Sequence, residues 1–161
     1  MKRFFYLILS FLLLSPLQAV GIGPCFEIIP GFTEDEGILQ AGVSCSVKFD
    51  NHPVQLNVCT DYSFIQDTFE ACITCDYLFL NKDFSNNMTF YTGIGEIAGA
   101  SINKDPALIL GARAVTGLSL ILCDGFLEYF IQGGFQPQGR FGNSSELQIN
   151  FPFNTGLRLY F

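Results

Sequence analysis

The sequence predicts an all-β fold, an eight-stranded antiparallel up-and-down transmembrane β-barrel, and three observations support this prediction. Eight segments of about 10–12 residues alternate between apolar and polar side chains. Short runs rich in Asp, Asn, Gly and Pro separate these segments. The polar positions carry amides and small residues more often than charges, since charged residues make up 14% of the chain and the mean hydropathy is +0.35.

The N-terminus has the pattern of a secretory signal peptide. Lys2 and Arg3 precede the apolar run FFYLILSFLLL, and SPLQA follows it, which predicts cleavage after Ala19. The run is shorter than the roughly 20 residues of a membrane-spanning helix. We therefore expect a signal peptide at 1–19 and a barrel at 20–161. Removing the two bases changes the formal net charge from −7 to −9, which argues against a nucleic-acid partner.

The first four strands are expected at 23–32, 38–49, 54–65 and 69–80, because alternation is regular there. The first strand places Cys25 on its polar, inward face. The apolar faces of the next three hold Leu39, Ala41, Val43, Cys45, Val47 and Phe49, then Val54, Leu56, Val58, Thr60, Tyr62 and Phe64, then Phe69, Ala71, Ile73, Cys75, Tyr77 and Phe79.

The last four strands are expected at 88–99, 107–118, 126–137 and 146–161. The strand at 88–99 is rich in glycine, and placing Glu96 on its polar face leaves Tyr91 and Ile97 on the other. In the last strand one face carries Arg158 and Asn154, and the other holds Phe151, Phe153, Thr155, Leu157, Leu159 and Phe161. A free edge would normally be blunted by charge, so we expect this strand to close the barrel by pairing with the first.

Two kinds of barrel have such strands, and they differ in which face of the sheet is in contact with water. A membrane barrel has an apolar outside and a polar inside, whereas a secreted lipocalin-like binder has the reverse. A face exposed to water would normally carry many Lys and Glu, and the polar faces here do not. The sequence favours the membrane barrel, with the lipocalin-like barrel as the alternative.

The stretches GARAVTGLS, FLEYFIQGGFQ and FPFNTGLRLYF are similar to segments of small barrel proteins of spirochaetes, and the whole mature chain resembles the small eight-stranded bacterial outer-membrane barrels of the OmpA transmembrane-domain, OmpX and OmpW kind. The C-terminal pattern of Phe153, Leu157, Leu159 and Phe161 resembles the assembly signal of such barrels. The resemblance implies the outer membrane of a diderm bacterium, with both termini periplasmic. It also implies turns near 50–53, 81–87 and 121–125 on the periplasmic side, and loops near 33–37, 66–68, 101–106 and 138–145 outside. The implied partners are outer-membrane lipid and the barrel assembly machinery, and we expect a monomer.

Charged residues at inward positions are the candidate functional residues. Alternation places the following inside: Lys48, Asp61, Glu70, Asp76, Glu96, Arg113, Glu128 and Arg158. Pairing the strands about their turns predicts a cluster of Glu96, Arg113 and Glu128 that blocks the lumen. Such a cluster is either structural pairing in a filled interior or a gate in a narrow ion path.

No catalytic, metal or cofactor site is predicted. Cys72 and Cys75 have CxxC spacing, but positions three apart on a strand point to opposite faces. Cys59 and Cys72 share the inner face of one hairpin, so a disulfide between them is an open alternative to free thiols. GIGEIA from Gly93 lacks the following helix that a dinucleotide site needs. We therefore expect a non-enzymatic barrel, structural or a narrow pore, with an OmpW-like carrier of small apolar solutes as the alternative.

Overall fold

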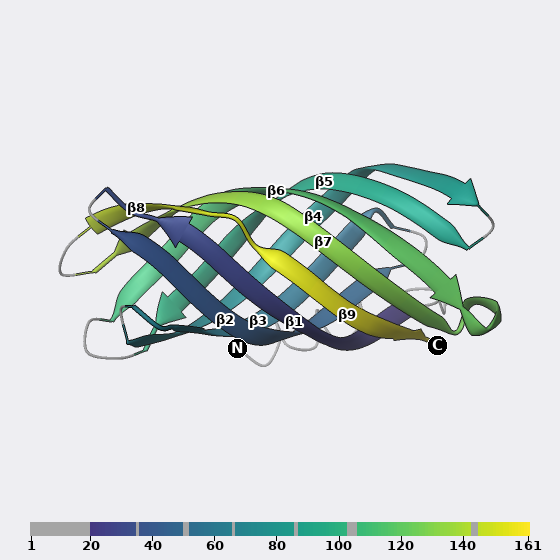
Figure 1. The fold of residues 1–161 in the computed structure, drawn as a ribbon, viewed down its shortest axis with the longest axis horizontal. Helices are drawn as coiled ribbons and strands as arrows, with labels where there is room; N and C mark the ends of the chain where they lie inside the picture. The colour runs from purple at the N-terminus through teal and green to yellow at the C-terminus, as the bar shows by residue number, and fades with distance from the viewer. Residues whose placement is uncertain are drawn as a thin grey trace, which may run out of the picture.

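The computed structural model describes residues 20–34, 36–49, 52–65, 67–85, 87–102, 106–142 and 145–161. These residues form one antiparallel sheet that closes into an elongated barrel, with strands running obliquely to its long axis (Figure 1). The predicted signal peptide at 1–19 lies outside the described residues. Within the part of the chain that is described, no helix is both long and apolar enough to cross a membrane.

Nine strand segments make up the eight strands of the barrel. Their bounds are β1 Val20–Phe32, β2 Gly37–Phe49, β3 Val54–Ser63, β4 Thr68–Ser85, β5 Met88–Ser101, β6 Ala107–Leu122, β7 Leu127–Phe141, β8 Ser145–Asn150 and β9 Phe153–Tyr160. β8 and β9 both pair with β7 and β1, so they are one strand interrupted at Phe151 and Pro152. A single 3₁₀ turn, Cys123–Gly125, joins β6 to β7.

The barrel closes where the last strand meets the first, as the sequence predicts. Glu27 lies opposite Asn154, Ile22 lies opposite Leu159, and Val20 and Phe161 exchange backbone hydrogen bonds of 3.3 Å. No free sheet edge remains along this seam, because every strand of the ring has a neighbour on each side. We call the rim where β1 begins and β9 ends the terminal rim, and the other the far rim.

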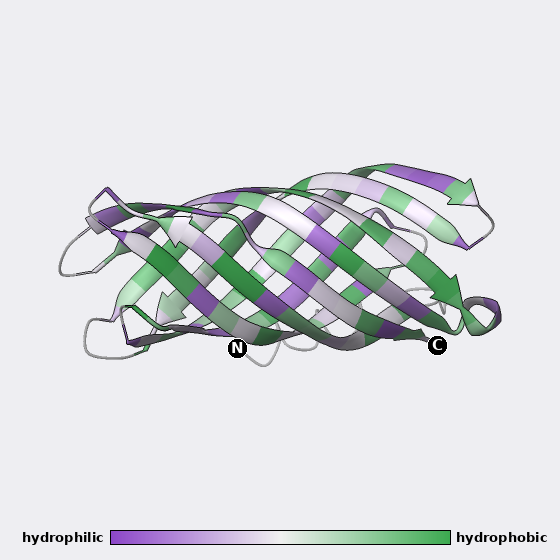
Figure 2. Ribbon diagram, viewed as in Figure 1, coloured by the Kyte–Doolittle hydropathy of each residue, from purple (hydrophilic) through white to green (hydrophobic). Residues whose placement is uncertain are grey.

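The two faces of the sheet have opposite chemistry, and their order rules out the lipocalin-like alternative. Inward positions are polar and buried, as at Gln55, Asn57 and Gln148. Outward positions are large and apolar, as at Phe26 and Phe153. Figure 2 shows hydrophobic and hydrophilic residues alternating along the strands. This arrangement suits a barrel surrounded by lipid.

The glycine-rich β5 is the strand whose faces were predicted wrongly. Tyr91 and Ile97 are buried inside, and Glu96 is exposed on the outer surface. Inside the barrel, Tyr91 packs with Leu78 and Val115. Ile97 packs with a second apolar group, which consists of Cys59, Cys72 and Ile109. The apolar contacts of these two large side chains decide the orientation of the strand, because its glycines have no side chain to bury on either face.

Several strands are also longer than predicted. β4 continues to Ser85 and β7 continues to Phe141. Much of the predicted turn at 81–87 and of the predicted loop at 138–145 is therefore strand, and the connections are shorter still than expected.

Candidate functional site: the charged interior

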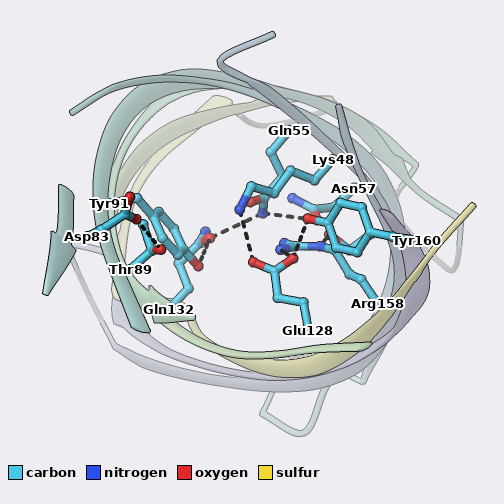
Figure 3. Close-up of polar contacts among 11 residues, drawn as sticks. Lys48, Gln55, Asn57, Asp83, Thr89, Tyr91, Glu128, Gln132, Arg158 and Tyr160 are labelled. Carbon is cyan, nitrogen blue, oxygen red and sulfur yellow. Dashed lines mark hydrogen bonds and ion pairs between the residues drawn. The ribbon is translucent and has the colours of Figure 1, made fainter. Parts of the chain in front are cut away.

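Glu128 is the centre of a charge cluster near the terminal rim. Its Oε1 accepts a hydrogen bond from Lys48 Nζ at 2.9 Å, and its Oε2 accepts one from Arg158 Nη1 at 2.9 Å. Tyr160 also donates its hydroxyl to Oε2 at 2.7 Å. Glu128 and Arg158 are completely buried. Figure 3 shows these side chains converging from opposite walls of the barrel.

Arg158 has further partners that hold its guanidinium in place. Its Nε donates to Ser46 Oγ at 3.0 Å, and its Cζ lies 3.7 Å from the centre of the Phe130 ring. Stacking on an aromatic ring leaves the edge of the guanidinium free for hydrogen bonds. One residue therefore connects β9 with β7 beside it and, over Gly23 of β1, with β2.

A layer of amides lies beside this cluster. Gln132 Oε1 accepts hydrogen bonds from Gln55 Nε2 and from the Tyr91 hydroxyl, both at 3.1 Å. Asn57 Nδ2 donates to Thr74 Oγ1 at 2.9 Å. The bonds to Gln132 join strands that are far apart in the sequence, whereas Asn57 and Thr74 lie opposite each other on one hairpin (Figure 3 shows Gln55, Tyr91 and Gln132). The lumen at this level is filled by side chains.

Asp76 and Arg113 form an ion pair across an intervening strand. Asp76 on β4 lies opposite Gly95 on β5, and Gly95 lies opposite Arg113 on β6. Arg113 Nε lies 3.1 Å from Asp76 Oδ1. A Cβ at position 95 would lie 2.3 Å from that same oxygen, so the glycine leaves the space in which the carboxylate crosses β5.

The same arrangement brings two acids together nearer the far rim. Asp61 on β3 lies opposite Gly42 on β2, which lies opposite Glu27 on β1. A Cβ at Gly42 would lie 2.0 Å from Asp61 Oδ1, so the Asp61 carboxyl crosses β2 at this glycine towards Glu27. Two carboxyls that face each other without a cation between them repel while both are charged.

The remaining interior charges lie near the far rim. Arg140 Nη1 contacts Glu70 Oε1 at 2.9 Å, from opposite walls of the barrel. A run of glutamines continues towards the rim, in which Gln136 donates to Gln138 at 2.9 Å and Gln138 donates to Gln148 at 3.0 Å. Ion pairs and amides thus occupy the interior at every level from Lys48 to Arg140.

The predicted cluster of Glu96, Arg113 and Glu128 is wrong. Glu96 is on the outer surface, Arg113 pairs with Asp76, and Glu128 pairs with Lys48 and Arg158. The prediction failed for Glu96 because a charge was used to assign the faces of a strand with few side chains. It failed for Arg113 because Asp76 reaches it from the next strand but one, over Gly95. It failed for Glu128 because Arg158, directly opposite on β9, was not considered, and because Lys48 comes from across the lumen.

The other predicted interior charges are inside, and two buried charges were missed. Lys48, Asp61, Glu70, Asp76 and Arg158 all lie on the inner face. Glu27 and Arg140 are also inside. Glu27 shares a face with Cys25, so alternation could have identified it. Arg140 was assigned to a loop, because the length of β7 was underestimated.

The cysteines and the C-terminal residues have the faces that alternation predicts. Cys59 and Cys72 lie directly opposite each other on β3 and β4, as free thiols in this structure. Cys72 is buried inside and Cys75 lies on the outer face. Exposed outward positions are occupied by Phe153, Leu157, Leu159 and Phe161. A role of these four residues in assembly stays a prediction.

Among the described residues, no group of three or more His, Cys, Asp or Glu side chains is arranged to hold a metal ion. His52 lines a pocket of about 520 Å³ at the terminal rim, together with Lys48 and Tyr160. This pocket ends on the cluster around Glu128. It is a vestibule above a filled interior.

Comparisons with known proteins identify the fold and leave the family open. No protein-family model matches the chain, and no curated protein matches it. The crystal structure of Neisserial surface protein A is similar, with a TM-score of 0.58 and 10% identity over 88% of this chain and 97% of that one. The N-terminal β-barrel domain of Pseudomonas aeruginosa OprF has a TM-score of 0.41 and 14% identity, over 83% of this chain and 96% of that domain. The first likeness supports the eight-stranded barrel fold.

Proposed function

We propose that this chain is a non-enzymatic outer-membrane β-barrel whose interior is closed by its own side chains. The observation that carries the proposal is the inverted arrangement of the barrel, with an apolar exterior and fully buried charges inside. In water this exterior would be a large apolar surface of the kind that drives association. In a bilayer it is the expected surface of a spanning barrel.

The closed interior supports a structural role over an open pore. A ring of charge conducts ions when water reaches it. Here Glu128 and Arg158 are wholly buried, and Gln55 and Gln132 bond across the lumen beside them. Eight strands leave an interior just wide enough for side chains. A narrow conducting path would require these pairs to separate.

Placement in the membrane follows from the same proposal. We infer that the terminal rim faces the periplasm, that both termini lie there, and that the chain is a monomer. Lipid and the barrel assembly machinery are its partners. The apolar row at Phe153, Leu157, Leu159 and Phe161 is the segment that the machinery would read.

Gel mobility and conductance test the proposal in two steps. The chain from Val20 onward is refolded in detergent and run on a gel with and without boiling. We expect the unboiled sample to migrate faster than the boiled one, because a closed barrel stays folded and compact in the detergent of the gel. A protein that is folded and soluble without detergent would overturn the membrane assignment.

The conductance of the unboiled protein is then measured in planar bilayers. We expect no steady channel, and a steady wild-type conductance would overturn the proposal of a closed interior.

A carrier of small apolar solutes is a second candidate, because the backbone pairing is irregular on both sides of β7. β6 and β7 pair up to Gly111 and Gln138 and again from Ala114 and Phe135, but the residues between these two pairs are unpaired. One of them is Pro137, which has no N–H to donate. On the other side the strand breaks at Pro152. A lateral passage at these points would speed transfer of an apolar dye between proteoliposomes and empty vesicles. Transfer no faster than between two sets of empty vesicles would exclude this candidate.

A further inference from the structure

Glu96 is a carboxylate on the lipid-facing surface, close to the middle of β5. Its neighbours in register are Cys75 on β4 and Ala112 on β6. It is exposed, and among the described residues it makes no ion pair or hydrogen bond. The outward residues around it are apolar, including Ile94 on its own strand.

A charge at this depth is costly in a membrane and calls for a partner. Ionisable side chains within the apolar band of a membrane protein are rare, and they mark functional sites by default. The interior carboxylates of this barrel have side-chain partners at every level, as Glu128 and Asp76 show. Among the described residues Glu96 has none, so a cation that pairs with it would come from outside the barrel.

The surface around Glu96 is a groove of about 610 Å³. Its floor contains the small residues Gly95, Ala112 and Ala114, and its walls are formed by larger side chains, namely Tyr77, Ile94, Phe135 and Pro137. The missing bulk on β6 makes the hollow, since larger side chains, namely Leu108, Leu110 and Leu118, occupy outward positions on either side of it along that strand. The hollow is open to the lipid, so a molecule lying in it would place its apolar part along these walls and its polar end on Glu96.

We propose that this groove binds an elongated apolar molecule that carries one amine, with its ammonium group on the Glu96 carboxylate. Charge complementarity selects the cation, because an ion pair in apolar surroundings is far stronger than in water. The inference rests on the lipid-facing location given under the proposed function.

A second copy of this chain does not fit the groove. Among the described bases, Lys48, Arg113, Arg140 and Arg158 are inside the barrel. Of the other described basic side chains, Lys82 lies near the terminal rim on β4 and His52 lines the pocket at the same rim, both away from the middle of the wall. The described part of a second barrel would therefore bring no cation to this depth.

Photolabelling in lipid nanodiscs tests the proposal. The folded barrel, first checked by its shift on boiling, is placed in phosphatidylcholine nanodiscs with a dodecylamine analogue that carries a diazirine in its chain. We expect labelled peptides from β4, β5 and β6 around Glu96. Unlabelled dodecylamine should compete for the site, and dodecanol should not.

Two variants distinguish a charged site from an apolar one. Glu96→Gln should fold and should lower the labelling of these peptides about tenfold, as expected for loss of one modest ion pair. Ala112→Leu keeps the charge, fills the floor and should lower labelling similarly. The matched control is Glu34→Gln, which removes the same charge from an exposed connection and should label like wild type.

Three results would overturn the proposal. One is equal labelling of wild type and Glu96→Gln, and another is competition by dodecanol as strong as by dodecylamine. The third is a change in oligomeric state in Glu96→Gln with labelling unchanged, which would assign the carboxylate to a protein interface. A missing shift on boiling would instead refute the membrane barrel itself, before any labelling.

Discussion

Three glutamates of this barrel show how position determines what one side chain does. Glu128 is held by two cations and a tyrosine, Glu27 meets a second acid, and Glu96 faces outward without a partner. Alternation in the sequence can assign a residue to a face. It cannot say which side chain from the opposite wall will meet it, because that depends on the tilt and closure of the whole ring.

Arg158→Ala should destabilise the barrel strongly. The substitution removes one of the two cations on the buried Glu128 and also the contacts with Ser46 and Phe130. Removing one partner of a buried ion pair typically costs about 3–5 kcal/mol in the free energy of unfolding. Urea unfolding in detergent, followed by gel mobility, measures the change. Lys82→Ala is the control at an exposed base, and equal midpoints for the two variants would contradict the assigned role of Arg158.

Asp61→Asn should stabilise the barrel, in contrast to most changes of a buried charge. The change removes one of two like charges that face each other over Gly42, and an amide can donate a hydrogen bond to the Glu27 carboxylate. We expect a gain on the order of 1 kcal/mol, the size of one net hydrogen bond. Glu70→Gln is the matched control, since it weakens the ion pair with Arg140 and should lower the unfolding midpoint. A loss of stability in Asp61→Asn would show that both acids are needed.

At the scale of the strand, alternation was a sound guide wherever both faces carried side chains. The last strand illustrates this, because Arg158 and Asn154 are inside and Phe153 and Leu157 outside, as predicted. β5 illustrates the failure, because its glycines have no side chains and so give no alternation between apolar and polar positions. Packing of Tyr91 in the interior then outweighed the preference of a carboxylate for the polar face.

Gly95→Ala should be destabilising even though alanine is otherwise acceptable in a strand. The new Cβ would lie 2.3 Å from both Asp76 Oδ1 and the carbonyl oxygen of Cys75, so the ion pair with Arg113 must shift. Overpacking of this kind costs about 1–3 kcal/mol. The midpoint of thermal unfolding in detergent measures this loss. Gly37→Ala is the control, because a Cβ at that position would meet nothing within 4 Å. Identical midpoints for both variants would refute the requirement for glycine.

At the scale of the whole molecule, the closed ring and its inverted polarity could be predicted from the sequence, and the contacts across the lumen could not. Barrel closure follows from eight alternating strands and an apolar last strand. The interior pairs join residues far apart in the chain, such as Lys48 and Glu128, which are 80 positions apart. No local pattern encodes such a contact.

Phe161→Ala should separate assembly in cells from intrinsic stability. Phe161 is 76% exposed, and its ring contact is with Phe126 at 6.3 Å. For protein refolded in detergent, the substitution should therefore lower the free energy of unfolding by only about 1 kcal/mol. The proposed assembly signal predicts a much larger loss of folded protein in outer membranes. The fraction that shifts on boiling, measured in both settings, tests this. Phe84→Ala is the control, because Phe84 is 63% exposed and has a similar ring contact with Phe90 at 6.2 Å.

The contacts across the lumen also bear on the order of events as the barrel forms. Lys48 and Glu128 are 80 positions apart, and Gln55 and Gln132 are 77 apart, whereas each hairpin joins neighbours in the chain. Such distant partners meet only after the sheet has curled and closed. Interactions made late contribute little to the folding transition state. The side chains that fill the lumen therefore set how slowly the finished barrel opens, and they have little influence on how fast it forms.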